Sequence, residues 1–193
     1  MIRSAEFAAL CGAILFPCFS VGFAQPPSPP PQFDSVEIGD DRSITFRIHA
    51  PDATAVRLES GDLPGLTFGQ GVDLAKGDDG VWKGTVDPLP AGAYRYHFNV
   101  DGVAVIDPRN TRSSGANSTI WSLAIVPGSD TFDAQQVPHG AVAEVCYYSE
   151  SLQRHRRMHV YTPPGYEKNQ EELPVFYLLH GATDSDDSWT TVG

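Results

Sequence analysis

The sequence predicts a β-sandwich followed by the beginning of an α/β domain, and two patterns predict these two parts. Between residues 33 and 126, seven or so short segments alternate apolar and polar residues and are separated by turn residues, which is typical of a β-sandwich. Near the end of the sequence, residues 175–179 form an unbroken apolar run, which is typical of a strand buried on both faces of a parallel sheet. The polar residues after Gly181 then predict a loop at the carboxyl end of that strand, where ligands bind in open α/β sheets.

The first 24 residues have the pattern of an export signal. Arg3 gives a positively charged start and residues 7–23 are mostly apolar. Gly22 and Ala24 place small residues at positions −3 and −1 of a cleavage site after Ala24. We expect a secreted or periplasmic protein with no membrane attachment after cleavage. The alternative is an uncleaved membrane anchor, because the apolar run of 17 residues is at the lower end of the length that spans a bilayer, roughly 17–25 residues. Residues 25–32 are rich in proline and predict an extended tether.

The strands of the sandwich, over residues 33–126, follow from the alternation. The alternating segments are residues 44–49, 56–59, 82–86, 94–100, 103–105 and 120–126. Residues 61–80 are rich in turn signals and predict a loop with one short strand near residues 66–68. Asp101-Gly102 predicts a two-residue hairpin turn, because both residues tolerate a positive φ.

The rest of the chain divides into a linker and a second part. Residues 127–140 predict the linker because they contain Gly and Pro without strand alternation. Residues 141–193 begin with two predicted strands, at 142–149 and 156–162, which form a hairpin. The net charge of −11 argues against nucleic acid as a partner.

Two further patterns are candidate chemical sites. Cys146 is the single thiol left after export, and its neighbours carry no charge that would lower its pKa, so a small strand residue is predicted rather than a nucleophile. Asp184, Asp186 and Asp187 could suggest calcium, but an EF-hand loop starting at Asp184 would need Gly where Trp189 stands. We expect residues 184–188 to cap a following helix, with Asp or Ser oxygens accepting from its first N–H groups, and we expect no metal and no cofactor.

The second part resembles a known family. Residues 158–166 (Met-His-Val-Tyr-Thr-Pro-Pro-Gly-Tyr), 175–181 (Val-Phe-Tyr-Leu-Leu-His-Gly) and 186–189 (Asp-Asp-Ser-Trp) are similar, in this order, to the start of an α/β-hydrolase of the esterase D, enterochelin-esterase and feruloyl-esterase group. The resemblance implies that an oxyanion-hole loop is formed by His180, Gly181 and Ala182. The fold class predicted for the whole chain is therefore an all-β immunoglobulin-like sandwich followed by the N-terminal part of an α/β-hydrolase domain.

The resemblance also implies a reaction. Family members hydrolyse carboxylic esters with a Ser nucleophile in a Gly-x-Ser-x-Gly turn, followed along the chain by an acid and a His. No such motif occurs in the 193 residues, and His180 precedes the nucleophile in the family's order, so we expect no catalytic residue in this chain. We expect an N-terminal fragment of an exported esterase, inactive alone, whose full-length form acts on small esters or on feruloyl or acetyl esters linked to polysaccharide.

The first part carries a second resemblance. Residues 80–110, which include Tyr-x-Tyr-x-Phe-x-Val-Asp-Gly at 94–102, resemble the early-set immunoglobulin-like module related to carbohydrate-binding module 48. Starch-binding relatives have a Trp where this chain has Ala104, and a Lys where it has His97. The remaining candidates for sugar stacking are Trp82, which we expect in the core, and Trp121, which stays open. A module that docks on the catalytic domain is favoured; the alternative is a carbohydrate-binding or glycosidase-accessory sandwich without catalytic activity.

Overall fold

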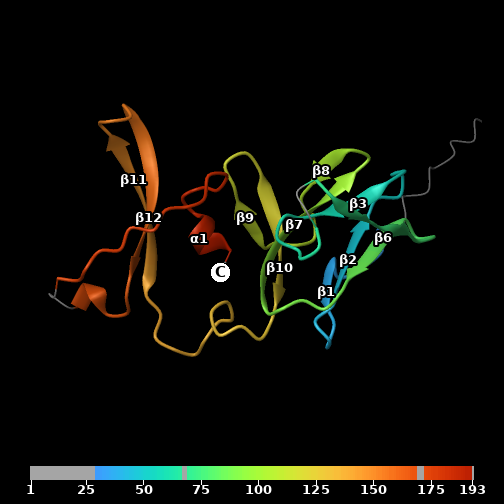
Figure 1. Ribbon diagram of the computed structural model, residues 1–193, viewed down its shortest axis with the longest axis horizontal. Coiled ribbons are helices and arrows are strands. Elements are labelled where there is room, and N and C mark those ends of the chain that lie inside the picture. The colour runs from blue at the N-terminus through green and yellow to red at the C-terminus, as the bar shows by residue number, and fades with distance from the viewer. Residues whose placement is uncertain (1–28, 67–68, 169–171, 193) are drawn as a thin grey trace, which may run out of the picture.

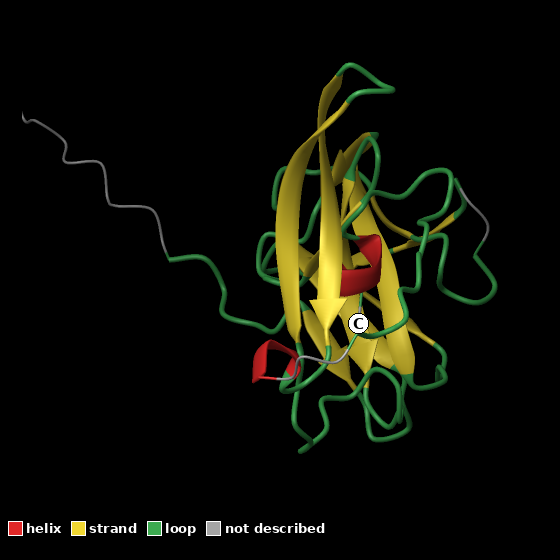
Figure 2. Ribbon diagram, turned by 90° about the vertical axis from the view of Figure 1, so that its left-hand side faces the viewer, coloured by secondary structure: helices red, strands yellow, loops and turns green. Residues whose placement is uncertain are grey.

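The computed structural model describes residues 29–66, 69–168 and 172–192, which form an almost entirely β structure (Figure 1, Figure 2). The predicted export signal, residues 1–24, lies outside the described residues. The strands of the sandwich are β1 (Val36–Ile38), β2 (Ile44–His49), β3 (Val56–Glu59), β4 (Gly71–Asp73), β5 (Ala75–Lys76), β6 (Val81–Val86), β7 (Gly92–Val100), β8 (Val103–Val105), β9 (Ser113–Gly115) and β10 (Ile120–Val126).

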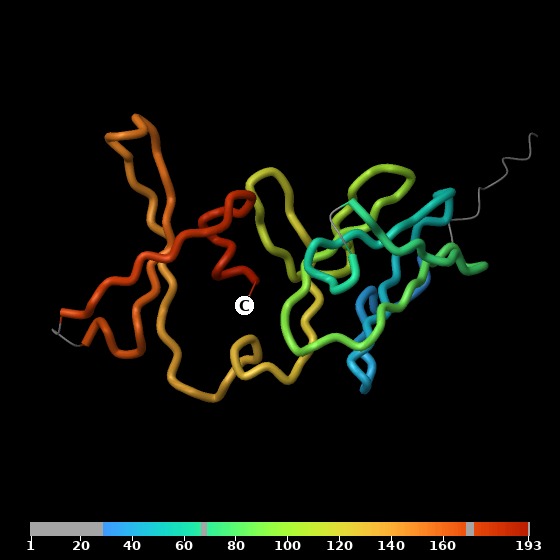
Figure 3. Tube along the Cα trace, viewed as in Figure 1, coloured from blue at the N-terminus to red at the C-terminus, as the bar shows by residue number. Residues whose placement is uncertain are grey.

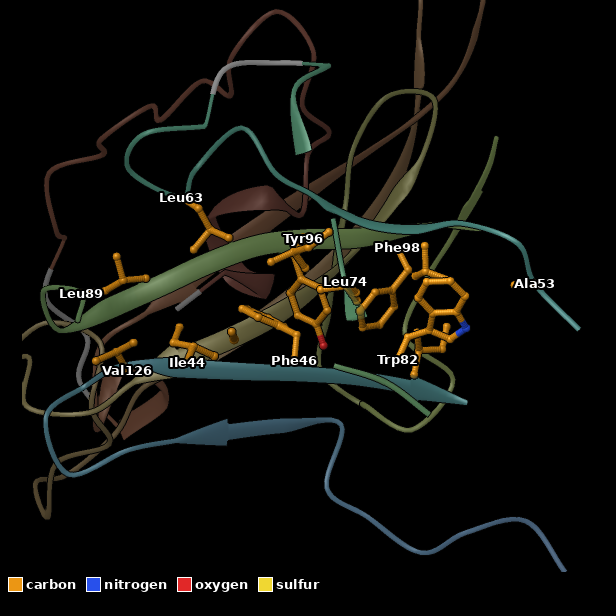
Figure 4. Close-up of a cluster of buried hydrophobic side chains, with 14 residues drawn as sticks. Ile44, Phe46, Ala53, Leu63, Leu74, Trp82, Leu89, Tyr96, Phe98 and Val126 are labelled. Atoms are coloured by element: carbon orange, nitrogen blue, oxygen red, sulfur yellow. The ribbon is translucent and has the colours of Figure 1, made fainter. Parts of the chain in front are cut away.

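These strands form two antiparallel sheets, which confirms the predicted sandwich. One sheet has the order β1-β2-β6-β5 and the other β4-β3-β7-β10-β9, with β8 beside β7. Figure 4 shows Phe46, Tyr96 and Phe98 in the space between the sheets. All three side chains are fully buried, and their rings meet at centroid distances of 4.7 Å (Phe46 to Tyr96) and 5.7 Å (Tyr96 to Phe98). Each such burial stabilises the fold by roughly 1.5–3 kcal/mol.

The turn between β7 and β8 confirms the hairpin predicted at Asp101-Gly102. Asp101 has φ +48° and Gly102 has φ +89°, as a two-residue turn of this kind requires. The Asp101 carboxylate also accepts hydrogen bonds from the backbone N–H groups of Thr54 and Ala55, at 3.0 and 2.8 Å. These bonds lower the pKa of Asp101, the bond from the Thr54 hydroxyl being the largest cause. One side chain therefore both forms the hairpin turn and ties it to the start of β3.

The short strand predicted near residues 66–68 forms a few residues later. Leu66 lies in no strand, residues 67–68 lie outside the described residues, and β4 forms at Gly71–Asp73. In β4, Val72 pairs with Leu58 of β3, so the strand is fixed by its partner rather than by the apolar residues before it.

The second part begins with the predicted hairpin. Strands β11 (Ala141–Ser149) and β12 (Arg154–Thr162) pair over their whole length, from Ala141 opposite Thr162 to Ser149 opposite Arg154. The 3-10 helix η1 (Tyr166–Lys168) follows, and the described chain closes with the short helix α1 (Ser188–Thr191). Among the described residues, no helix is long and apolar enough to cross a membrane.

The apolar run at residues 175–179, predicted to be a buried strand, lies in no strand of the structure. Its side chains are between 53% and 83% exposed. A buried strand needs hydrogen-bonded neighbours and covered faces, and none of the strands in the described ranges pairs with this run. The α/β-hydrolase part of the predicted fold therefore stays a prediction.

Candidate functional site

The candidate oxyanion loop is a tight turn. The backbone N–H of Asp184 donates to the carbonyl oxygen of Gly181 at 3.1 Å, which closes a turn around Ala182. The His180 Nδ1 atom lies 2.7 Å from the same carbonyl oxygen, and its side chain is exposed. Within the described ranges, the N–H groups of Gly181 and Ala182 have no hydrogen-bond acceptor. The turn therefore offers two neighbouring backbone donors, the kind of group that binds an oxyanion.

Arg95 of the sandwich holds this turn. Its Nη1 donates to Asp184 Oδ1 at 2.9 Å, and its Nε donates to Asp62 Oδ2 at 2.8 Å. The side chains of all three residues are only 23–28% exposed. The bond to Asp62 and then the bond to Asp184 raise the pKa of Arg95. A positive charge shared by two carboxylates thus links a strand of the sandwich to the far end of the chain.

Strand β9 adds backbone contacts to the same segment, and Figure 1 and Figure 3 show the C-terminal segment returning to lie between β12 and β9. Asn117, just after β9, donates its N–H to the carbonyl oxygen of Thr183 at 2.9 Å. Ala116 forms an isolated antiparallel bridge with Asp184. Helix α1 lies on β9, where Thr191 Oγ1 is 3.3 Å from Ser114 Oγ. The turn is therefore docked by a short β-like pairing as well as by charge.

The β11–β12 hairpin holds the other side of the segment. Arg157 of β12 donates from Nε to Asp186 Oδ2 at 2.7 Å and lies 3.5 Å from Asp187 Oδ2. The bond from Arg157 lowers the pKa of Asp186, and the same bond raises the pKa of Arg157. His159 Nδ1 lies 3.1 Å from the carbonyl oxygen of Asp186. The segment thus bridges the sandwich and the hairpin.

The three acids of this segment do not act as predicted. Helix α1 forms, but Asp187 at its N-cap makes no side-chain capping bond, so the predicted capping role is wrong. Its carboxylate instead accepts from the Ser185 hydroxyl and faces Arg157. Asp184 and Asp186 pair with arginines from two different parts of the chain, and no metal-like cluster occurs among the described residues.

The two candidate sugar-stacking residues lie in different places. Trp82 is 7% exposed in the sandwich core and donates from Nε1 to the Ala50 carbonyl oxygen at 2.9 Å, so its ring does not form a surface platform. Trp121 is half-buried, and its ring lies 4.6 Å from that of His97 between centroids. His97 Nε2 in turn lies 3.0 Å from Glu59 Oε2.

Trp121 and the docked turn share one face of the sandwich. Trp121 pairs directly with Ser114 across the sheet, so their side chains project from the same face. Helix α1 contacts Ser114, and Arg95 projects from this face as well, because Tyr94 and Tyr96 point into the core. The face of the sandwich that carries Trp121 therefore adjoins the turn at His180.

Cys146 is exposed on β11, opposite Arg157, whose guanidinium is engaged by Asp186. Sequence reasoning missed Arg95 and its partner Asp62. The alternation places Arg95 on the polar face of its strand, but no local signal shows that Asp184, 89 positions along the chain, binds it.

Comparisons with known proteins give relatives of partial coverage. No family model matches the chain. Over 157 residues, 77% of this chain, it is 36% identical to an endo-1,4-beta-xylanase/feruloyl esterase of Xylanibacter ruminicola, and it spans only 21% of that protein. Among solved structures, the enterobactin esterase FES from Shigella flexneri aligns with a TM-score of 0.45 and 20% identity, over 61% of this chain and 39% of that one.

A second solved structure matches about half of the chain. The apo pullulanase from Paenibacillus barengoltzii aligns with a TM-score of 0.35 and 20% identity, over 46% of this chain and 14% of that one.

Proposed function

We propose that this chain is the N-terminal portion of an exported carboxylic ester hydrolase that acts on esters attached to polysaccharide, of the feruloyl or acetyl kind. The observation that carries the proposal is the 36% identity to a xylanase/feruloyl esterase over 157 residues. The match extends over more residues than the sandwich contains, so it includes part of the second half of the chain.

The geometry of the turn supports an acyl-transfer role. In this reaction a carbonyl oxygen becomes negative, and backbone donors aimed at it lower the barrier; one such donor contributes on the order of 3 kcal/mol. Gly181 and Ala182 supply two donors, while His180 shapes the turn through its contact with the Gly181 carbonyl oxygen. The Ser nucleophile, the acid and the catalytic His belong, by the family resemblance, to sequence beyond residue 193.

Within this proposal the sandwich is a positioning module. Arg95 and Asn117 contact the turn itself, at Asp184 and Thr183, and Ser114 contacts helix α1 after it. A sandwich that only bound glycan would not need these contacts. The sandwich therefore contributes to the shape of the ester site, which is consistent with Ala104 standing where sugar-binding relatives have a Trp.

The decisive experiment compares two proteins. The full-length coding sequence, expressed without its export signal, should release ferulate or acetate from substituted xylo-oligosaccharides, and the 193-residue chain should release neither. Gly181→Ala in the full-length enzyme should lower kcat. Absence of ester hydrolysis by the folded full-length protein, or hydrolysis by the 193-residue chain alone, would refute the proposal.

The second candidate is a carbohydrate-binding sandwich without catalytic activity, and the ring of Trp121 favours it. Trp121 lies half-buried on the outer face beside His97, where a sugar ring could pack. Titration with malto- and xylo-oligosaccharides tests this role. Saturable binding that Trp121→Ala abolishes would support it, and no binding would eliminate it.

A further inference from the structure

The carboxylate of Asp184 lies beside the turn that offers the two backbone donors. A Cβ placed on Gly181 would stand only 2.8 Å from Asp184 Oδ2, so this carboxylate lies against the glycine. The backbone of Asp184 is held there as well, because its N–H donates to the Gly181 carbonyl oxygen at 3.1 Å. A negative charge therefore stands next to the N–H groups of Gly181 and Ala182.

This negative charge opposes the binding of a second one. Two like charges a few ångströms apart repel each other more strongly at a protein surface than in bulk water, because the effective dielectric constant is lower. A bare Asp184 carboxylate would therefore disfavour the oxyanion that an ester carbonyl forms at the two N–H groups. These donors stabilise an oxyanion well only if a nearby cation offsets the charge of Asp184.

Arg95 of the sandwich supplies that cation. Its Nη1 donates to Asp184 Oδ1 at 2.9 Å, while the other oxygen, Oδ2, is the one that lies against Gly181. The Nε and Nη2 atoms of Arg95 donate to the two oxygens of Asp62, at 2.8 and 3.2 Å, and this pair of bonds fixes the plane of the guanidinium. Asp62 also accepts from the backbone N–H of Arg95 at 3.1 Å. Asp62 therefore orients the guanidinium, and Nη1 faces the carboxylate of the turn.

The cation on the other side of the segment serves different acids. Arg157 of β12 pairs with Asp186 and Asp187, at 2.7 and 3.5 Å. Among the ion pairs within the described ranges, Asp184 has one partner, which is Arg95. The charge of Asp184 is therefore offset from the sandwich and not from the hairpin.

We propose that Arg95 is a positioning residue for ester hydrolysis, which offsets the charge of Asp184 so that the turn can hold an oxyanion. This inference rests on the proposed function, because it gives Arg95 a part in that reaction. It differs from docking alone in one respect. The charge of the guanidinium is required, and the need for it disappears when Asp184 loses its own charge.

The first test is hydrogen exchange in the 193-residue chain, which requires no esterase activity. Hydroxide removes the proton of a free amide, so an anion forms at the N–H, and a nearby negative charge slows this step. Arg95→Leu should slow exchange at Gly181 and Ala182 about three- to tenfold, whereas a loss of contacts without a charge effect would leave exchange unchanged or speed it. Adding Asp184→Asn should restore the original rate. Absence of slowing, or slowing that Asp184→Asn does not reverse, overturns the proposal.

Two milder variants keep this test decisive if Arg95→Leu is unstable. Asp184→Asn alone keeps an acceptor oxygen for Arg95 and removes the negative charge, so it should speed exchange at Gly181 and Ala182. Arg95→Lys keeps the positive charge and should leave exchange at these two amides close to its original rate. Unchanged exchange in Asp184→Asn would contradict an effect of its charge on the turn.

The second test is kinetic and uses the full-length enzyme. Arg95→Leu should lower kcat for feruloyl or acetyl esters about tenfold with little change in KM, because the charge acts on the oxyanion and not on the bound ester. Adding Asp184→Asn should recover most of this loss. Arg57→Leu, on the outer face of the same sheet, should leave kcat unchanged.

The two hypotheses fail on different results. A folded full-length protein without ester hydrolysis refutes the proposed function, and hydrogen exchange then still decides whether Arg95 offsets the charge of Asp184. An active enzyme in which Arg95→Leu keeps its kcat, or in which Asp184→Asn recovers none of the loss, refutes the role of Arg95 while the proposed function stands.

Discussion

Replacing Arg95 with Leu tests whether the sandwich holds the turn at His180. The guanidinium is shared by Asp62 and Asp184, and the side chains of this triad are 23–28% exposed. Exposed ion pairs contribute roughly 0.2–1 kcal/mol, whereas breaking a buried pair costs about 3–5 kcal/mol. For this intermediate exposure we expect about 1–2 kcal/mol for each carboxylate, so Arg95→Leu should lower the free energy of unfolding by about 2–4 kcal/mol.

The loss of stability that comes from the Arg95–Asp184 pair can be measured separately from the loss that comes from the Arg95–Asp62 pair. A double-mutant cycle between Arg95→Leu and Asp184→Asn should show a coupling of about 1–2 kcal/mol in urea unfolding. Loss of the pair should also speed hydrogen exchange at the Asn117 N–H, which donates to Thr183, by roughly 5- to 30-fold. The matched control is Arg57→Leu, whose ion pair with Asp73 is largely exposed at 40% and 86%, and which should change stability by less than about 1 kcal/mol.

A coupling of zero, together with unchanged exchange at Asn117 in Arg95→Leu, would contradict docking of the turn by Arg95. A large loss of stability without a change in exchange would also contradict it, because Arg95 would then act through Asp62 alone. Either result would show that the turn is docked by other contacts or not docked at all.

Three other variants test separate features. Gly181→Ala should increase hydrogen exchange at the Asp184 N–H several-fold, because the new Cβ would lie 2.8 Å from Asp184 Oδ2. Arg95 bonds the same carboxylate and keeps it from moving away, and unchanged exchange would contradict this prediction. Tyr96→Phe should lower the free energy of unfolding in urea by about 1–3 kcal/mol, because the buried Asp107 loses the 2.6 Å hydrogen bond from the Tyr96 hydroxyl. The control is Tyr94→Phe, which removes an exposed hydrogen bond and should lower it by less than about 1 kcal/mol. Arg157 lowers the pKa of Asp186. The stability that this ion pair contributes is therefore present above the ordinary Asp pKa and is lost as pH falls through the lowered value. Acid should therefore release the hairpin, and Arg157→Gln should remove that part of the pH dependence; an identical acid transition in both proteins would refute this.

The sandwich could be predicted because the residues that determine each of its longer strands and its hairpin turn are neighbours in the sequence. Alternation at residues 44–49 and 94–100 fixes which side chains face the core, and Asp101-Gly102 fixes the hairpin turn; the structure has both. The pattern near Leu66 does not locate β4, because this strand depends on its pairing with β3, which lies elsewhere in the sequence. A strand of three residues has too few side chains to show a period of its own.

The candidate site could be predicted only in part. The motif marks the turn at His180 as a candidate oxyanion loop, and that role stays a prediction; no local pattern indicates the contacts that hold the turn. Asp184 meets Arg95 across 89 positions, and Asp186 meets Arg157 across 29. An isolated Asp has the same local pattern whether it caps a helix, binds a metal or pairs with an arginine, so sequence favoured the commonest role, a helix cap, which the structure corrects.

The linker of residues 127–140 reduces the contact energy that is needed to keep the C-terminal segment docked on the sandwich. It joins the end of β10 to the start of β11, and the segment at Asp184 then returns to β9, so the chain forms a closed circuit through the sandwich. Within such a circuit the partners are present at an effective concentration in the millimolar range, and a few contacts of about 1 kcal/mol each are enough to keep them together. A single protease cut in the linker would remove this advantage and let the two halves separate on dilution.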